Sequence, residues 1–513
     1  MKVIQNKIVI ISMVGFLICS GTPLTSQYIE NQGLDDQSIV KTTSTTKTIY
    51  LLIKESLYIS LQNHIEVFIE DLNKEGYQAI IHQIPDTYTN QNHEEIRDLL
   101  LDGYQNNDLT GAILIGNLPY VIISSEDDEF ISDIYYMDID GQWIDEDEND
   151  KYETHTGNTD LEIWIGRLYT PNGGNDVELL KNYFRKNHKY RSGSLSLPKR
   201  ALYYETRWDE FHDPDIEIPY LNNLQTIYTD ITFIAPWDGE PSPSDYLTRL
   251  QEGYEFLYLH SWSYSTSHRF TNGQISSKDI LESDPHVFFY LLSACNVANI
   301  ANDKYIAGSY IFSQTYGLTA IAPTTSSYLQ PIWTYPDLTR ALRDGKNIGE
   351  SFIENYNEMI SEHTEICSMY THVLLGDPTC VLLTEYTDGQ NNPPETPTIQ
   401  GNKNGPIDEI QYYDISSNDK DLDMISFEIH WGDETTNKTE TTTQSGEILT
   451  ISHVWSEKGT YEIKVKAIDE QGAESDWNTL EVSMPKTPRS SHSRTVLKDI
   501  QTRLFSILFD IMK

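Results

Sequence analysis

The sequence predicts an α/β protein with mostly parallel sheets, arranged as two subdomains and followed by an all-β sandwich. Three observations support this prediction. Apolar runs of strand length alternate with helix-spaced apolar residues over residues 48–387, Gly, Asn and Pro replace that pattern at 388–397, and short alternating strands follow. At 513 residues the chain is also too long for one ordinary hydrophobic core.

The first α/β subdomain is expected over residues 48–190, as an accessory unit. Ile49–Ile53 has the composition of a strand, and the apolar residues after it recur every three or four positions until Gly76, where a glycine ends the predicted helix. Gly111–Gly116 is a continuous apolar run, typical of a strand buried on both faces of a parallel sheet. The helix is expected to bury Leu57, Leu61, Ile65, Phe68 and Leu72.

The second α/β subdomain is expected over residues 191–387. Its predicted strands are Ala201–Glu205, Ile231–Ile234, Tyr254–His260, His286–Ala294 and Leu318–Ala322. Near its end, one long helix is expected through Leu338, Leu342, Ile348, Phe352 and Tyr356.

The remaining chain divides into a linker, a sandwich and a tail. Residues 388–397 form the linker. Residues 398–485 form the sandwich, in which Tyr461–Ala467 alternates strictly between apolar and polar residues, as a half-buried strand does. Residues 486–513 are a basic, serine-rich tail ending in a short amphipathic helix, which can lie on a membrane or dock onto the protein but is too short to span a bilayer.

The N-terminal residues predict export. A basic head and an apolar run of about a dozen residues, followed by small and polar residues, give residues 1–26 the form of a secretory signal. Cys19 allows an alternative, a lipid anchor. Residues 27–47 are then a short N-terminal segment or a pro-segment. The mature protein is expected to be secreted or held at the cell surface.

The net charge argues against some classes of binding partner, and the number of cysteines indicates a free thiol. The formal net charge is −42, so most of the surface repels nucleic acid and anionic lipid, and no nucleic-acid partner is expected. The mature chain keeps three cysteines, and an odd number in a secreted protein indicates a free thiol. Cys367 and Cys380 are close enough in sequence to form a disulfide, which would leave Cys295 free. Three independent thiols are the alternative, and only the geometry decides between them.

An acidic stretch around residues 138–150 has two interpretations. Asp138, Asp140, Asp145 and Asp147 belong to a group of closely spaced carboxylates with a glycine at position 141, and such oxygens can hold a structural calcium ion. Their spacing does not match the helix–loop–helix calcium loop, and a flexible acidic surface loop explains them as well. No cofactor is required by the chemistry proposed below.

Two predicted strands each end in a residue able to do chemistry. His260 follows the strand that starts at Tyr254, and Cys295 follows the strand that ends at Ala294. Reacting groups collect where parallel strands end side by side at the carboxyl edge of a sheet, so these two are expected to face each other. A neighbouring histidine raises the thiolate fraction of a cysteine, and the thiolate suits acyl transfer. The backbone N–H groups of Cys295 and Ser261 are the candidates for stabilising the oxyanion.

The order of these motifs resembles the gingipain-type cysteine peptidases, relatives of caspases and legumains. Their signature is a strand ending in His-Gly and a second ending in Ala-Cys, and this chain has His260-Ser261 and Ala294-Cys295. The resemblance covers about residues 48–385, and it implies that both α/β subdomains are caspase-like. It extends through Thr266–His268, Leu318–Ala322, Leu375–Thr379, Ser132–Tyr135 and Gly166-Arg167.

This resemblance implies roles for individual residues. Cys295 is expected to be the nucleophile and His260 the general base and acid, with Glu205, or alternatively Asp209, as the third group. Asp215 and Tyr328 lie where related enzymes bind the substrate side chain. Ser261 departs from the family's glycine, which matters if that position requires a positive φ. His268 is expected to be structural.

The C-terminal sandwich resembles the PKD-type (polycystic-kidney-disease) immunoglobulin-like domain. Trp431-Gly432-Asp433, His453–Trp455 and Gly459–Tyr461 carry that resemblance. Such modules space or dock catalytic domains, and together with the tail this one implies association with a cell or membrane surface.

These inferences predict a secreted or surface cysteine endopeptidase that acts on protein or peptide substrates through a thioester acyl-enzyme. Two alternatives remain. One is an inactive surface-binding or adhesion protein that uses its PKD-type domain, and the other is a transpeptidase that acts in protein sorting.

Overall fold

The computed structural model describes residues 46–125, 128–206, 224–236, 241–325, 336–362, 368–382, 391–439 and 441–485. The predicted signal peptide, nearly all of the segment after it and the C-terminal tail lie outside these residues. Within the described residues, no helix is long and apolar enough to cross a membrane.

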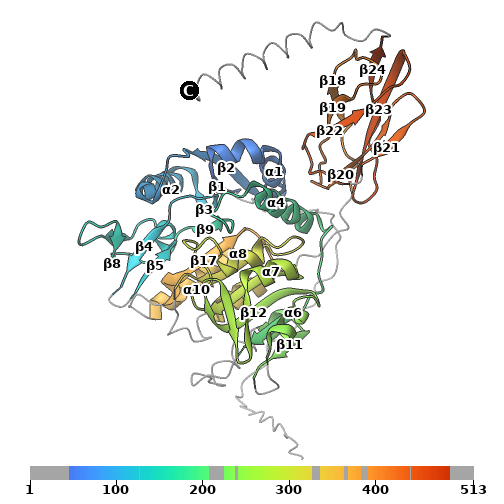
Figure 1. Ribbon diagram of the computed structural model, residues 1–513. Helices are drawn as coiled ribbons and strands as arrows, with labels where there is room; N and C mark the ends of the chain where they lie inside the picture. The colour runs from blue at the N-terminus through green and yellow to red at the C-terminus, as the bar shows by residue number, and fades with distance from the viewer. Residues whose placement is uncertain are drawn as a thin grey trace, which may run out of the picture. The chain divides into compact units, whose positions relative to one another are not determined.

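A large, mostly parallel sheet forms the centre of the α/β part (Figure 1). Its strand order is β11-β10-β12-β15-β16-β17-β9-β3-β1-β2, with β13 and β14 extending from β12 as a hairpin. Only the β16–β17 pair on the main path and this hairpin are antiparallel. The strands are β1 (Lys47–Lys54), β2 (Tyr77–Ile84), β3 (Leu109–Ile115), β9 (Trp164–Leu168), β10 (Ala201–Glu205), β11 (Ile231–Ile234), β12 (Tyr254–Tyr264), β13 (Ser267–Phe270), β14 (Gly273–Ser276), β15 (Val287–Ala294), β16 (Thr319–Pro323) and β17 (His372–Gly376).

Helices connect these strands, as the alternating pattern predicts. They are α1 (Glu55–Lys74), α2 (His93–Asn107), α3 (Ile134–Met137), α4 (Val177–Ser192), α6 (Pro243–Arg249), α7 (Ser277–Ser283), α8 (Ile306–Ile311), α9 (Pro336–Arg343) and α10 (Ile348–Glu362), with short 3-10 turns at Asn90–Asn92 and Ser368–Thr371. Together with the parallel-rich sheet, they confirm the predicted α/β class.

The two predicted subdomains share one sheet. Strand β17, late in the chain, pairs with β9 from the first half, with Leu374 opposite Gly166. Gly166 has no space for a side chain, because a Cβ there would lie 2.4 Å from the ring of Pro378. The motifs Gly166-Arg167 and Leu375–Thr379 therefore meet at the seam between the halves.

The first helix follows its predicted pattern. In α1 the buried residues include all five that the helical spacing indicates, and α1 packs against α4. Gly76 has a φ of +89° and its N–H donates to the carbonyl of Asn73 just after the helix ends. A glycine suits that left-handed conformation because it has no Cβ.

The single long helix predicted near residues 338–356 is wrong. The structure has two helices there, α9 and α10, which pack against each other. Gly345 has a φ of +83°, and the N–H groups of Gly345 and Lys346 bond to the carbonyls of Leu342 and Ala341. This is a Schellman ending, which stops a helix even where apolar periodicity continues through it.

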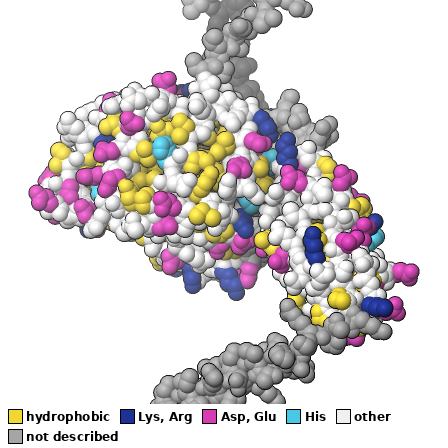
Figure 2. Space-filling model, turned by 90° about the horizontal axis from the view of Figure 1, so that it is seen from above, with side chains coloured by type: hydrophobic (Ala, Val, Ile, Leu, Met, Phe, Trp, Pro, Cys, Tyr) yellow, Lys and Arg dark blue, Asp and Glu magenta, His cyan; other side chains and the backbone are white. Residues whose placement is uncertain are grey.

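Small sheets flank the first half. One contains β4 (Val121–Ser124), β5 (Glu129–Ser132) and β7 (Lys151–Tyr152), and the other contains β6 (Gln142–Ile144) and β8 (Thr154–Thr156). The acidic stretch crosses this region. Elsewhere, Figure 2 shows acidic side chains spread over several parts of the visible surface.

The C-terminal strands form two antiparallel sheets with a separate core. One sheet has the order β18-β19-β22 and the other β21-β20-β23-β24. Trp431 and Trp455 are both buried in this core, at a ring distance of 5.8 Å. The strands are β18 (Thr398–Gly401), β19 (Gln411–Ser416), β20 (Ile425–His430), β21 (Thr436–Lys438), β22 (Leu449–His453), β23 (Gly459–Asp469) and β24 (Asn478–Met484).

Candidate active site

The register of three neighbouring strands aligns Glu205, His260 and Cys295 at one edge of the sheet. Glu205, the last residue of β10, pairs with His260 of β12, and His260 pairs with Ser293 of β15. Cys295 directly follows β15 and stands two positions beyond Ser293. Because side chains alternate between faces, all three positions belong to the same face, where the parallel pairing of β10 with β12 ends. Strand β12 itself does not end at His260 as predicted but continues to Tyr264, where it pairs with β13.

A layer of aromatic rings supports this face. Tyr203 and Tyr258 stand two residues before Glu205 and His260, and their rings stack at 4.9 Å. Phe233 of β11 stacks on Tyr203 at 4.7 Å. These rings are buried or half-buried, so the strand ends that carry Glu205 and His260 rest on a packed layer.

Glu205 occupies a buried position, with 2% of its surface exposed. The chain is fixed there because the N–H of Thr206 donates to the carbonyl of His260 at 3.0 Å. Asp209, the alternative third residue, lies outside the described residues.

Ser261 fits its place in β12 without strain. Its φ is not positive, and it pairs with Ala294 as an ordinary strand residue. Its hydroxyl accepts a hydrogen bond from Thr206 Oγ1 at 3.1 Å and donates to the carbonyl of Trp262 at 3.1 Å. The backbone at this position therefore does not require a glycine.

Cys295 lies at the start of a turn and is partly exposed, with no disulfide. Asn296 after it has a φ of +59°, and its N–H donates to the carbonyl of Thr325 at 2.9 Å. The N–H of Ala298 donates to the carbonyl of Pro323 at 2.9 Å. The turn after Cys295 is thus fastened to the end of β16.

Cys380 has a different environment. Its thiol is free, so the disulfide considered with Cys367 is not formed, although Cys367 itself lies outside the described residues. Burial, reinforced by the charge of Asp377, raises the pKa of the Cys380 thiol well above its usual value. A thiol that stays protonated is a poor nucleophile.

His268 lies in the hairpin that follows the candidate site and is fully buried. Its Nδ1 lies 2.7 Å from Ser263 Oγ, and burial lowers the pKa of the imidazole to about 3. The ring is therefore neutral at physiological pH and packs as part of the hairpin, against Tyr310.

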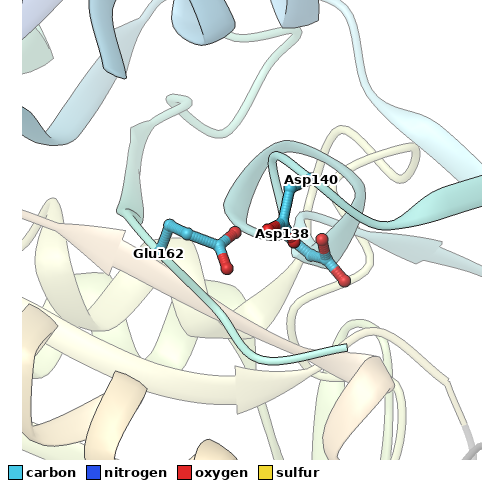
Figure 3. Close-up of side chains that lie close together, drawn as sticks. All are labelled: Asp138, Asp140 and Glu162. Carbon is cyan, nitrogen blue, oxygen red and sulfur yellow. The ribbon is translucent and has the colours of Figure 1, made fainter. Parts of the chain in front are cut away.

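The four acidic residues considered for calcium lie in two separate groups. Asp138 and Asp140 lie with Glu162, whose carboxylate extends toward them (Figure 3), and Asp145 and Asp147 lie with Glu153. Sequence reasoning missed Glu153 and Glu162. Each lies further along the chain than the aspartates of its group, and no regular spacing connects it to them.

Both carboxylate oxygens of Asp138, the buried member of the first group, are already in contact with other protein atoms. One oxygen of Asp138 accepts the N–H of Gly141 at 2.5 Å, and the other lies 2.6 Å from His155 Nε2. Burial and the nearby charges of Asp138 and Asp140 raise the pKa of Glu162 to about 7. The second group is in an exposed loop, where Asp145 accepts N–H bonds from Asn149 and Asp150.

Two motifs of the predicted family have structural roles. Asp133 and Arg167 form a buried ion pair, in which Arg167 Nε and Nη2 lie 2.7–2.9 Å from the carboxylate. Asp377 pairs with Arg191 and accepts a bond from Asn187 Nδ2 at 2.9 Å. The proposed substrate-binding residues Asp215 and Tyr328 lie outside the described residues.

Comparison with known proteins supports the fold. No family model and no curated protein matches the chain. Among solved structures, the Arg-specific cysteine proteinase gingipain R is similar over 87% of this chain and 99% of its own, with a TM-score of 0.52 and 13% identity. The PKD domain of an M14-like peptidase from a Thermoplasmatales archaeon is 41% identical over 19% of this chain and all of its own, with a TM-score of 0.19. The likeness to gingipain R shows a peptidase-like fold.

Proposed function

We propose that this protein is a secreted or surface cysteine endopeptidase with Cys295 as nucleophile and His260 as general base and acid. The observation that carries the proposal is the strand register, which aligns Glu205, His260 and the residue two before Cys295 on one face of a gingipain-like sheet. The partial exposure of Cys295, which forms no disulfide, supports it further.

The chemistry follows from these positions. His260 accepts the thiol proton, and the Cys295 sulfur attacks the carbonyl carbon of the scissile peptide bond. The electron pair of the carbonyl moves to its oxygen, where the backbone N–H groups of Cys295 and Ser261 stabilise the charge. When the carbonyl re-forms, the C–N bond breaks, and His260 gives its proton to the leaving amine. A thioester remains.

Hydrolysis of the thioester repeats the same steps with water. His260 takes a proton from water as the water oxygen bonds to the acyl carbon, the C–S bond breaks when the carbonyl re-forms, and the leaving sulfur takes the proton back from His260. Glu205 is assigned the role of a positioning residue that orients the imidazole. No metal is needed for any of these steps, and calcium at the acidic groups would be structural.

Substrate choice belongs to residues outside the described part of the chain. Asp215 and Tyr328 are proposed to bind the substrate side chain, which would favour a basic residue before the cleaved bond. A peptide-library cleavage profile of the protein and of Asp215→Asn tests this: the preference for Arg and Lys should fall in the variant.

A thiol-directed probe tests the catalytic assignment. An acyloxymethyl ketone should label Cys295 in the native protein, and labelling should fall sharply in His260→Ala because the thiolate is no longer favoured. Cys380→Ala is the matched control, and it should label like the unchanged protein because Cys380 is buried. Absence of labelling in folded protein would refute the peptidase and would favour the adhesion alternative.

Hydrolysis and transpeptidation share the acyl-enzyme and differ in whether water or an amine then attacks it. When an amine nucleophile is added to a cleavage reaction, a hydrolase releases mainly the free acid. If most of the acyl group is transferred to a low concentration of added amine, the protein is a transpeptidase instead.

A further inference from the structure

The hairpin beyond His260 presents exposed aromatic side chains on the face that carries His260. Strand β12 continues past His260 to Tyr264, and its side chains alternate there. Ser261 and Ser263 are buried, whereas Trp262 and Tyr264 are 43% and 54% exposed. Because alternate residues of a strand share a face, Trp262 and Tyr264 lie in line with His260.

A cationic side chain belongs to the same surface. Arg269 of β13 pairs with Trp262 in the hairpin and is exposed. Its Nη1 donates to the hydroxyl of Tyr264 at 3.1 Å, and its guanidinium lies 5.7 Å from the centre of that ring. No carboxylate among the described residues forms an ion pair with Arg269. The surface therefore presents a positive charge within a chain whose formal net charge is −42.

Contacts on the buried side of the hairpin fix its backbone. Ser263 Oγ lies 2.7 Å from Nδ1 of His268, which is fully buried. At the turn, the carbonyl of Ser265 accepts the N–H of Ile306 at 2.7 Å, and Ser265 Oγ accepts Asn302 Nδ2 at 2.9 Å. The exposed aromatic side chains therefore stand on a fixed backbone, and a ligand that binds them does not have to order the hairpin first.

The position of the hairpin relative to the two reacting groups indicates which part of a substrate it meets. In the proposed reaction the acyl part stays on Cys295, while His260 gives its proton to the leaving amine, so the leaving part passes His260 on the side away from Cys295. Ser261 Oγ lies 3.1 Å from Thr206 Oγ1 and 3.4 Å from the carbonyl of Arg269, so Arg269 lies near the end of β10. Strand β12 separates β10 from β15, the strand that Cys295 follows. The hairpin is therefore on the leaving side.

We propose that Trp262 and Arg269 bind the part of a peptide substrate that follows the cleaved bond, with Trp262 against a large apolar side chain and Arg269 paired with the carboxylate of an Asp or Glu side chain. This inference rests on the proposed peptidase function. Residues of a strand are about 3.3 Å apart, so Trp262 stands about 7 Å beyond His260 along β12. An extended substrate covers that distance with two residues, which assigns these contacts to the second and third residues after the bond.

Cleavage of a peptide library tests the role of each side chain. The three residues after the cleaved bond are varied in amidated peptides, so that only side chains supply carboxylates. The protein should prefer a large apolar residue at the second position and Asp or Glu at the third. Trp262→Ala should lose the apolar preference, and Arg269→Glu should replace the preference for acidic residues with one for Lys and Arg. A residue that acts only through folding would not reverse the charge preference.

A pair of substrates distinguishes this surface from the catalytic groups. One is an extended peptide with the preferred residues, and the other has the same residues before the bond but a coumarin amide after it. Trp262→Ala should lower kcat/KM at least about tenfold on the extended peptide and much less on the coumarin substrate. Tyr412→Ala, at an exposed aromatic residue of β19, is the matched control and should change neither value. Equal losses on both substrates in Trp262→Ala would overturn the proposal.

Peptide binding tests the surface without turnover. The full chain with Cys295→Ala is titrated against the amidated peptide Ser-Phe-Glu-Ala, whose free amino group represents the leaving amine, with a dye near its C-terminus for fluorescence polarisation. Adding Trp262→Ala or Arg269→Glu should weaken binding at least about tenfold. If neither variant weakens binding while the thiol probe labels Cys295, this inference fails and the proposed peptidase stands. If the probe does not label Cys295 but binding depends on Trp262 and Arg269, the peptidase fails and the hairpin remains a peptide-binding surface.

Discussion

Cys295 and Cys380 are the two cysteines of the described structure, and each lies just beyond a strand of the same sheet. Cys295 follows β15, is partly exposed and stands two positions beyond Ser293, the residue that pairs with His260. Cys380 follows β17, is buried and touches Asp377, Asn187 and Arg191 through its sulfur at 3.6–3.9 Å. The position of a cysteine after a strand therefore does not determine its environment, because the neighbouring residues decide whether the thiol is exposed or packed.

The neighbours of Cys380 form a satisfied polar cluster. Burial alone would raise the pKa of Asp377, but the charge of Arg191 and the hydrogen bonds of Thr379, Arg191 and Asn187 outweigh it and lower that pKa. Asp419 is also buried but has carboxylates as neighbours, and its pKa rises. The charge of the neighbouring groups therefore decides the direction in which the pKa of a buried carboxyl group shifts.

The largest expected difference between the two cysteines is in activity. Cys295→Ala should lower kcat/KM on a peptide substrate by at least about 10³-fold, because it removes the proposed nucleophile. Cys380→Ala should leave kcat/KM per folded molecule unchanged. Both are measured by cleavage of a fluorogenic peptide, with folding checked by circular dichroism. Equal losses of kcat/KM in the two variants would contradict the assignment of Cys295, rather than Cys380, as the nucleophile.

The next largest effect concerns the cluster around Cys380. Arg191→Met should lower the free energy of unfolding by about 3–5 kcal/mol, because it leaves the buried charge of Asp377 unpaired. Urea unfolding measures this change. Adding Asp377→Asn should recover part of the loss, since the unpaired charge is then removed. Arg343→Met, at an exposed ion pair, is the control and should have little effect.

The next prediction concerns His188 of α4, the helix that supplies Asn187 and Arg191 to that cluster. The contribution of His188 to the free energy of unfolding should depend on pH. Burial would lower the pKa of His188, but the hydrogen bond of its Nδ1 with Asp71 Oδ2 at 2.6 Å and the charges of Asp71 and Asp421 outweigh it and raise the pKa to about 9. The folded state therefore holds this proton more tightly than the unfolded state, and its contribution is complete below about pH 6.5 and lost as the pH rises to about 9.

The free energy of unfolding should thus fall by up to about 3 kcal/mol more in the unchanged protein than in His188→Gln over this interval. Urea unfolding at several pH values measures the difference between the two proteins. Parallel pH profiles would show that His188 does not hold its proton in the folded state.

The smallest effect is expected beside Cys295, at Ser261. Ser261→Gly should change kcat/KM by less than about tenfold, because the serine already adopts an ordinary strand conformation. It should lower the free energy of unfolding by about 1 kcal/mol through loss of the hydroxyl hydrogen bonds. A large gain in activity would mean that the serine side chain obstructs the substrate.

The sequence by itself determined the periodic elements and the candidate dyad. Apolar spacing gave the buried stripe of α1, the strands that end at Glu205 and Ala294, and the start of β12, because burial imposes a period of 3.6 on helices and 2 on strands. It did not give the end of β12, which continues past His260 to Tyr264. It failed at residues 344–347, where the turn depends on a local Schellman ending that apolar periodicity does not reveal.

Only the tertiary structure decided which residues meet. It brought Arg167 to Asp133, Arg191 to Asp377 and Asn392 to Asp421, and it separated the acidic residues near Asp138 into two groups. It also showed that Ser261 needs no positive φ. Such pairings join residues far apart in the chain, and nothing in local composition encodes them, because pairing depends on how strands are ordered in the sheet and how loops cross its edges.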